Sequence, residues 1–108
     1  MMTSLKILYI NTFGQTRFTK EKQLQIEDMI KNYNCDIAHL QECDLDDESF
    51  KGCPYIMNNF SIISNNSQTK FGTASLIKDN FQVDNVKFDT EGQVIVFNIL
   101  QYLSYSRL

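Results

Sequence analysis

Two polar residues, Asn11 and Glu42, occupy positions where they could share a metal ion. Each directly follows a short apolar run, residues 5–10 (LKILYI) and residues 36–41 (DIAHLQ). If the runs are neighbouring parallel strands, both residues lie at the carboxyl edge of the sheet, where the departing loops form a crevice. A carboxylate beside an amide is a partial shell for Mg²⁺, which prefers oxygen ligands and keeps several waters.

A structural role for the two residues stays open at this point, because Asn and Glu at strand ends also act as caps, turn formers or solvated groups.

A zinc site is disfavoured. The chain has three cysteines without paired or metal-type spacing and one histidine, His39, and all four would have to converge. The cysteines are therefore expected to be free thiols in a reducing compartment. Strand alternation predicts that His39 points to the face opposite Glu42, as a core or second-layer histidine.

The composition limits the class of protein. The 108 residues suffice for one domain, and 43% hydrophobic with 21% charged residues is ordinary for a globular chain. The net charge of −3 and the acidic residues 44–48 disfavour passive nucleic-acid binding, but not metal-assisted cleavage, which requires carboxylates. No run approaches the ~20 apolar residues of a membrane span, and the N-terminus does not resemble a secretory signal. We expect an intracellular protein, with the nucleus included.

The elements that position the two residues can be predicted from the pattern. Residues 20–33 have helical spacing, with Ile26, Met29, Ile30 and Tyr33 on one face and Thr19 as the N-cap. Together with the two apolar runs they predict a strand–helix–strand crossover, whose strands lack clean alternation, as expected if both faces are covered. An acidic loop over residues 44–54 follows.

Two hairpins complete the predicted order. The first pairs residues 58–64 with 72–77, and the second pairs residues 83–88 with 93–100. The second is joined by residues 89–92 (DTEG), a type I turn signature with Asp first and Gly fourth. The sequence thus predicts an α/β fold: one crossover unit followed by an antiparallel meander.

The crossover unit resembles the opening of the endonuclease/exonuclease/phosphatase superfamily. The resemblance rests on ILYINTFG, the helix, and the D-I-x-x-L-Q-E-like motif of residues 36–42 (DIAHLQE). It implies the N-terminal part of that family's four-layer α/β sandwich. It also implies that Asn11 and Glu42 are catalytic ligands of Mg²⁺, which Mn²⁺ could replace.

The later segments are also similar to the family. Residues 70–77 (KFGTASLI) match a family strand, and residues 87–99 (KFDTEGQVIVFNI) resemble the endonuclease domains of non-LTR (LINE-type) retrotransposons most closely. The expected domain is therefore a partial one over residues 5–100, with a non-family tail over residues 101–108. This resemblance implies a DNA substrate, with Arg17 and Lys70 as candidate contacts to it.

The departures from the family set the functional expectation. Its Tyr/Asn strand, its Asp-x-Asn motif and its Ser-Asp-His motif do not occur in the 108 residues. We therefore expect a truncated, metal-dependent, DNA endonuclease-like remnant that is inactive alone. We also expect marginal stability, with an exposed sheet through which the chain could self-associate. The alternatives are a small-molecule or lipid phosphodiesterase fragment of the same superfamily, and a non-enzymatic α/β interaction module.

Overall fold

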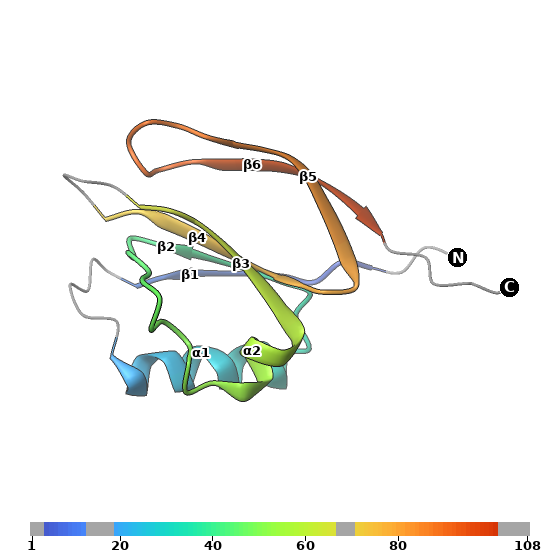
Figure 1. Cartoon of the computed structure of the whole chain (residues 1–108). Helices are drawn as coiled ribbons and strands as arrows, with labels where there is room; N and C mark the ends of the chain where they lie inside the picture. Colours follow the sequence, from blue (N-terminus) through green and yellow to red (C-terminus); the bar gives the residue numbers. More distant parts are fainter. Residues whose placement is uncertain (1–3, 13–18, 67–70, 102–108) are drawn as a thin grey trace, which may run out of the picture.

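A four-stranded mixed sheet separates two helices on one face from a β-hairpin on the other (Figure 1). The computed structural model describes residues 4–12, 19–66 and 71–101. Within them the strand order is β1-β2-β4-β3, where β1 and β2 are parallel and the other neighbours are antiparallel. The four strands are β1 Ile7–Asn11, β2 Ile37–Gln41, β3 Phe60–Asn65 and β4 Thr73–Lys78.

The predicted strand–helix–strand unit is confirmed. The helix α1 spans Lys20–Asn32, and the Thr19 hydroxyl accepts a hydrogen bond from the Lys22 N–H at 3.1 Å, as an N-cap does. Asn34 adopts a left-handed φ of 53° just after the helix, which fits a termination residue. The prediction for Tyr33 was wrong: it is the C-cap residue, and its side chain is exposed.

The main core lies between the sheet and the helices. Its fully buried side chains include Ile26, Ile30, Leu40, Phe50, Ile56 and Leu76. The acidic loop is fastened to α1 at Phe50, whose N–H donates to the Gln23 side chain at 2.9 Å.

A short helix, α2 (Pro54–Asn59), was not predicted, because six residues are too few to show a helical period. Its first N–H groups are satisfied by Glu27, whose carboxylate accepts from Tyr55 at 2.8 Å and Ile56 at 3.2 Å. A buried carboxylate on α1 therefore fixes the start of α2.

Within the described residues, no helix has the length and apolar character needed to cross a membrane.

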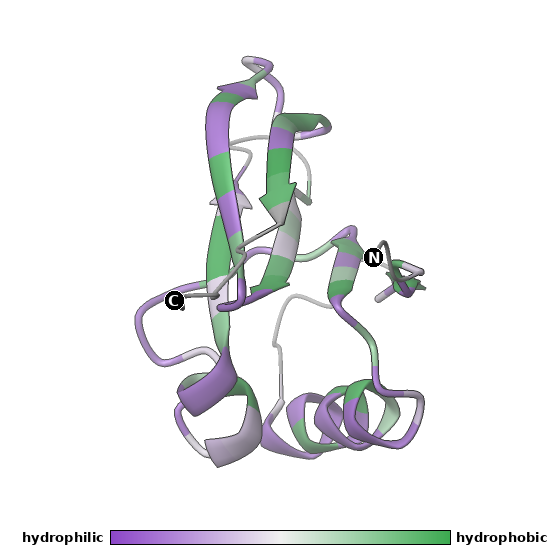
Figure 2. Cartoon of the chain, turned by 90° about the vertical axis from the view of Figure 1, so that its right-hand side faces the viewer, coloured by the Kyte–Doolittle hydropathy of each residue, from purple (hydrophilic) through white to green (hydrophobic). Residues whose placement is uncertain are grey.

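The hairpin β5 (Phe81–Phe88) and β6 (Ile95–Gln101) covers part of the second sheet face, with contacts between β6 and β4. Apolar and polar bands alternate along its strands in Figure 2, as expected for a ribbon with one face against a sheet. The prediction that both faces of β1 are covered was wrong. Tyr9 is 68% exposed and Ile7 43% exposed, since the hairpin lies over β4 and β1 is the outer strand.

Candidate functional site

Asn11 and Glu42 meet at the carboxyl edge of the sheet. Asn11 ends β1 opposite Gln41 of β2, and Glu42 is the next residue along the chain. The Asn11 side-chain amide donates to the Glu42 carboxylate, with 2.6 Å between Nδ2 and Oε2. The parallel pairing of the two strands thus brings together the two residues that the sequence singled out.

Thr12 fastens the ends of the two strands together. It is buried, and its backbone N–H donates to the Gln41 carbonyl at 2.9 Å. Its hydroxyl lies within donating distance of two carbonyl oxygens, 3.0 Å from that of Gln41 and 2.5 Å from that of Glu42. No role was predicted for Thr12 from the sequence. A hydroxyl directly after the strand-end Asn was the available signal.

Gly72 holds the other side of Glu42. The N–H of Cys43 donates to the Gly72 carbonyl at 3.0 Å, and the N–H of Gly72 donates to Asp44 Oδ1 at 2.9 Å. A Cβ atom at Gly72 would lie 2.3 Å from the Asn65 carbonyl oxygen, so only glycine fits here. The backbone around Glu42 is therefore clamped from both neighbouring strands.

Glu42 has a left-handed backbone, with φ 55°. A non-glycine residue adopts this conformation only at a cost, and here it turns the residue out of the regular alternation of β2. The alternation argument that placed His39 opposite Glu42 therefore fails. The Glu42 carboxylate contacts Asn11, which shares its sheet face with Tyr9 and hence with His39.

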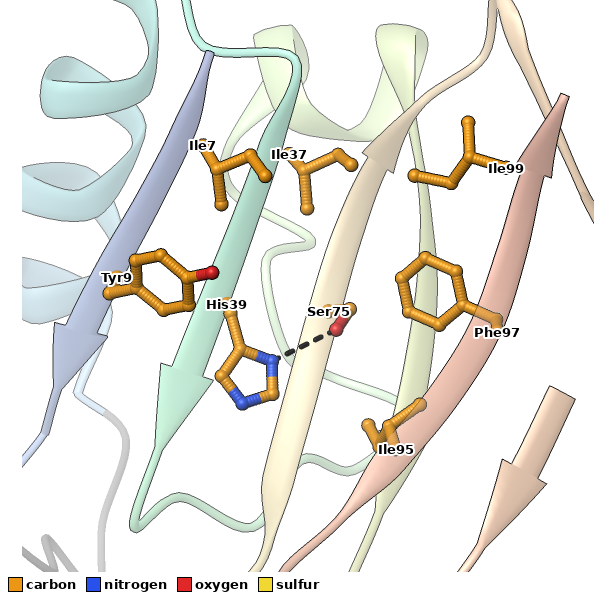
Figure 3. Close-up of a pocket in the computed structure, with 8 residues that line it drawn as sticks. All are labelled: Ile7, Tyr9, Ile37, His39, Ser75, Ile95, Phe97 and Ile99. Carbon is orange, nitrogen blue, oxygen red and sulfur yellow. Dashed lines mark hydrogen bonds between the residues drawn. The ribbon is translucent and has the colours of Figure 1, made fainter. Parts of the chain in front are cut away.

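His39, the middle residue of β2, lines a cavity between the sheet and β6 (Figure 3). The cavity has a volume of about 290 Å³ and is lined mainly by apolar side chains: Ile7, Tyr9, Ile37, His39, Ser75, Ile95, Phe97 and Ile99. The His39 Nδ1 atom is 3.0 Å from the Ser75 hydroxyl, and the Tyr9 ring meets the imidazole edge-on at 6.1 Å. Burial lowers the pKa of His39, which favours the neutral ring.

The donor set at the strand ends fits a hard divalent cation. One carboxylate and one amide are the few protein oxygens that Mg²⁺ usually takes, and the exposed Glu42 side chain leaves room for water. The described residues contain no cluster of three or more His, Cys, Asp or Glu that could hold a metal by themselves. Soft coordination is disfavoured, because all three cysteines are buried and burial raises the pKa of Cys43 to about 12.

Arg17 and Lys70 lie outside the described residues. In the acidic loop, Asp46 Oδ1 accepts from the Glu48 N–H at 2.8 Å, and Glu48 pairs with Lys51 at 2.6 Å. These local contacts indicate that Asp46 and Glu48 stabilise the loop itself.

The turn of the hairpin is attached near the same edge. The Asn65 side-chain amide, at the end of β3, donates to Asp89 Oδ1 and to the Val94 carbonyl, each at 2.9 Å. Asp89 Oδ1 also accepts from the N–H groups of Gln93 and Val94. Desolvation alone would raise the pKa of Asp89, but these hydrogen bonds outweigh it and lower the pKa. The turn is thereby fixed to the sheet beside the candidate site.

Comparison with known proteins reveals a shared fold. No protein-family model matches the sequence, and no curated protein matches it either. The structure is similar to truncated TDP2 of Caenorhabditis elegans, with a TM-score of 0.58 and 20% identity over 96% of this chain and 50% of that one. It is also similar to TDP2 from C. elegans, with a TM-score of 0.56 and 22% identity over 79% of this chain and 28% of that one.

The chain therefore has a small α/β fold, a mixed sheet with a hairpin, that resembles part of TDP2, a member of the endonuclease/exonuclease/phosphatase superfamily. It spans half of the first of these chains and less of the second. At these identities the likeness concerns the fold.

Proposed function

We propose that the strand ends at Asn11 and Glu42 bind a divalent cation, Mg²⁺ or Mn²⁺, as the metal-binding part of a phosphodiesterase centre. The observation that carries this proposal is the 2.6 Å contact between the Asn11 amide and the Glu42 carboxylate at the carboxyl edge of two parallel strands. The fold of the comparison structures supports it, since the superfamily uses Mg²⁺. The fold would then be the N-terminal part of the family's four-layer sandwich.

Each residue has a definite task in this proposal. Glu42 and Asn11 would hold the cation, and a bound cation would polarise the phosphate of a phosphodiester. Thr12 and Gly72 keep the Glu42 backbone in place, which reduces the reorganisation that binding requires. They are positioning residues.

Hydrolysis also needs a group that orients or deprotonates the attacking water and a group that stabilises the developing charge. The family motifs that supply them do not occur in these 108 residues. We propose that this chain by itself binds the cation without cleaving a phosphodiester. Losing members of a catalytic unit costs orders of magnitude in rate, because the parts act together.

The proposed substrate of the complete site is DNA. The support is the resemblance of residues 87–99 to retrotransposon endonuclease domains, and under this proposal the chain derives from such an element. Arg17 and Lys70 would contact the DNA backbone. A lipid or small-molecule phosphodiester is the alternative within the superfamily, and a non-enzymatic module would bind no cation at this edge.

The test is a Mn²⁺ titration of the full chain followed by NMR, because a paramagnetic ion broadens the amide signals near its site. We expect selective broadening at Asn11, Thr12 and Gly72, with millimolar affinity, because two protein ligands bind Mg²⁺-type ions weakly. Glu42→Gln keeps the side-chain size and should abolish the effect. Glu48→Gln, at an exposed acid in the same loop region, is the matched control and should not.

Two results would contradict parts of the proposal. If the broadening is unchanged in Glu42→Gln, the proposed metal site is refuted. Metal-dependent nicking of supercoiled plasmid by the chain, lost in Glu42→Gln, would keep the metal site but refute inactivity of the chain alone. The same samples should be assayed for cleavage of a lipid-type phosphodiester. Cleavage of that compound without nicking of DNA would favour the alternative substrate.

A further inference from the structure

In the part of the chain that the structure describes, the strand β1 is an open edge of the sheet. Within the described residues it pairs with β2 alone. Lys6 directs its backbone toward the β2 side, since its N–H donates to Asp36 Oδ2 at 2.9 Å and its carbonyl accepts from the Asp36 N–H at 2.8 Å. The Thr12 N–H also points to β2. Strand backbones alternate, so the N–H and C=O groups of Ile7 and Tyr9 point outward, to the open edge.

Among the described residues, this edge lacks the protections that usually keep strands from pairing. The five residues of β1 (ILYIN) include no charged residue and no proline, and pairing with β2 runs in register without a bulge. The side chains around it are apolar and accessible: Leu5 is 41% exposed, Ile7 43%, Tyr9 68% and Tyr33 65%. Such a strand is a template for an additional strand.

Hollows flank β1 on both faces of the sheet. On the hairpin side is the cavity of about 290 Å³ whose lining includes Ile7 and Tyr9 (Figure 3). A second cavity, of about 370 Å³, is lined by Lys6, Ile7, Leu8, Tyr33 and Cys35. An added strand directs successive side chains to alternate faces, so it could fill both hollows at once, as in recognition by strand addition.

We propose that the occupant of this edge is β1 of a second copy of the chain, paired antiparallel about a two-fold axis at Leu8. The reason is self-complementarity. This register places Ile7 of each copy opposite Tyr9 of the other, and both residues direct their backbone groups outward, so they form hydrogen-bonded pairs. An aromatic side chain opposite a β-branched one is a favourable cross-strand pair.

The charges agree with the same register. Leu8 lies opposite its own copy, and Lys6 lies opposite Ile10, so no like charges face each other across the strand pair. The two sheets join into one continuous sheet of eight strands, twice the four of one copy. Leu5 of one copy lies opposite Asn11 of the other, so the interface extends to the end of the strand that carries the candidate metal ligand.

The size of the patch predicts a weak dimer. Four partly exposed side chains of this kind present on the order of 400 Å² per copy, or about 800 Å² in the pair, below the ~1,200–2,000 Å² of stable complexes. We expect a dissociation constant of about 10–100 μM.

The test is sedimentation equilibrium of the full chain up to about 500 μM, well above the expected dissociation constant. We expect a monomer–dimer equilibrium whose dissociation constant Tyr9→Lys raises at least tenfold, because the substitution places a charge next to the centre of the strand pair, opposite Ile7 of the other copy. The matched control is Val96→Lys, at a valine 54% exposed on the hairpin, which should leave the equilibrium unchanged. Circular dichroism verifies that both variants fold.

A second measurement tests the register independently of Tyr9→Lys. Opposite residues of a hydrogen-bonded antiparallel pair have Cα atoms about 5.5 Å apart, within the range of a disulfide. A mixture of Ile7→Cys and Tyr9→Cys chains should therefore cross-link under copper–phenanthroline oxidation faster than either variant alone. The three native cysteines are buried and should not compete.

Three results would overturn the proposal. A monomer at every concentration would mean that the edge is closed or is filled by some other segment. A dimer insensitive to Tyr9→Lys would place the interface elsewhere. Equal cross-linking by a single variant and by the mixture would refute the antiparallel register. If Tyr9→Lys does not fold, the cross-linking comparison decides.

Discussion

Two buried threonines near the candidate site should differ in how the same substitution changes the stability of the chain. The Thr12 hydroxyl lies 3.0 Å from the Gln41 carbonyl oxygen and 2.5 Å from that of Glu42. The Thr73 hydroxyl is buried and has no hydrogen-bond partner among the described residues. Thr73 is the register partner of Gln41, so the two threonines flank the end of β2.

Valine replaces the hydroxyl with a methyl group of similar size. The difference between the two variants in the free energy of unfolding therefore reports the contribution of the hydrogen bond. In Thr12→Val the Glu42 carbonyl loses its donor, whereas the Gln41 carbonyl keeps the Thr12 N–H. We expect the free energy of unfolding to fall by about 1–2 kcal/mol. Thr73→Val removes a desolvated, unpaired hydroxyl, so it should be neutral or raise that free energy by about 1 kcal/mol.

The assay is urea denaturation followed by circular dichroism, with linear extrapolation and a check that the slope is unchanged. The expected separation of the two variants is about 1–3 kcal/mol. Thr12→Val should also weaken the Mn²⁺ effect at Glu42, because the clamp on its backbone is released. Equal losses of stability in both variants would refute the reasoning, since hydrogen bonding would then not distinguish the two hydroxyls.

Three further predictions follow from the same structure. Gly72→Ala should lower the free energy of unfolding, measured by thermal denaturation, by at least about 2 kcal/mol, because its Cβ would lie 2.3 Å from the Asn65 carbonyl oxygen. Gly52→Ala is the control and should lower it by less than about 1 kcal/mol, because the atom nearest to its Cβ belongs to the flexible Lys20 side chain. The lowered pKa of His39 means that the unfolded chain binds the proton more readily. Stability should therefore fall as the pH drops below the ordinary histidine range of about 6.5, and urea unfolding of His39→Gln should show a weaker dependence. The raised pKa of Cys43, about 12, keeps its thiol protonated, so maleimide labelling with mass spectrometry should detect it only after unfolding.

The parts of the fold that depend on local signals could be predicted from the sequence. The Thr19 cap and the spacing of Ile26 and Ile30 indicate α1, and the strand–helix–strand order indicates the parallel pair β1 and β2. Both hairpins follow from turn residues between strand-forming runs. The proximity of Asn11 and Glu42 followed from this topology alone, without any detail of side-chain packing.

The remaining features depend on contacts between distant segments. The insertion of β4 beside β2 and the helix α2, which depends on a Glu27 carboxylate from α1, have no periodic signal. The backbone clamps by Thr12 and Gly72 involve residues that meet only in the folded sheet. The alternation rule failed for His39 relative to Glu42, because it applies inside a strand and Glu42 lies one residue beyond β2.

The left-handed backbone of Glu42 has a consequence for how this sequence can change. A non-glycine residue with positive φ costs about 1–2 kcal/mol, of which a glycine would recover the part that exceeds its own entropic cost of roughly 0.5–1 kcal/mol. Selection for thermal stability alone would therefore favour replacing Glu42 by glycine, and the carboxylate would be among the first groups to disappear. A glutamate retained at this position across related chains would indicate selection for what the carboxylate does, since folding by itself favours its loss.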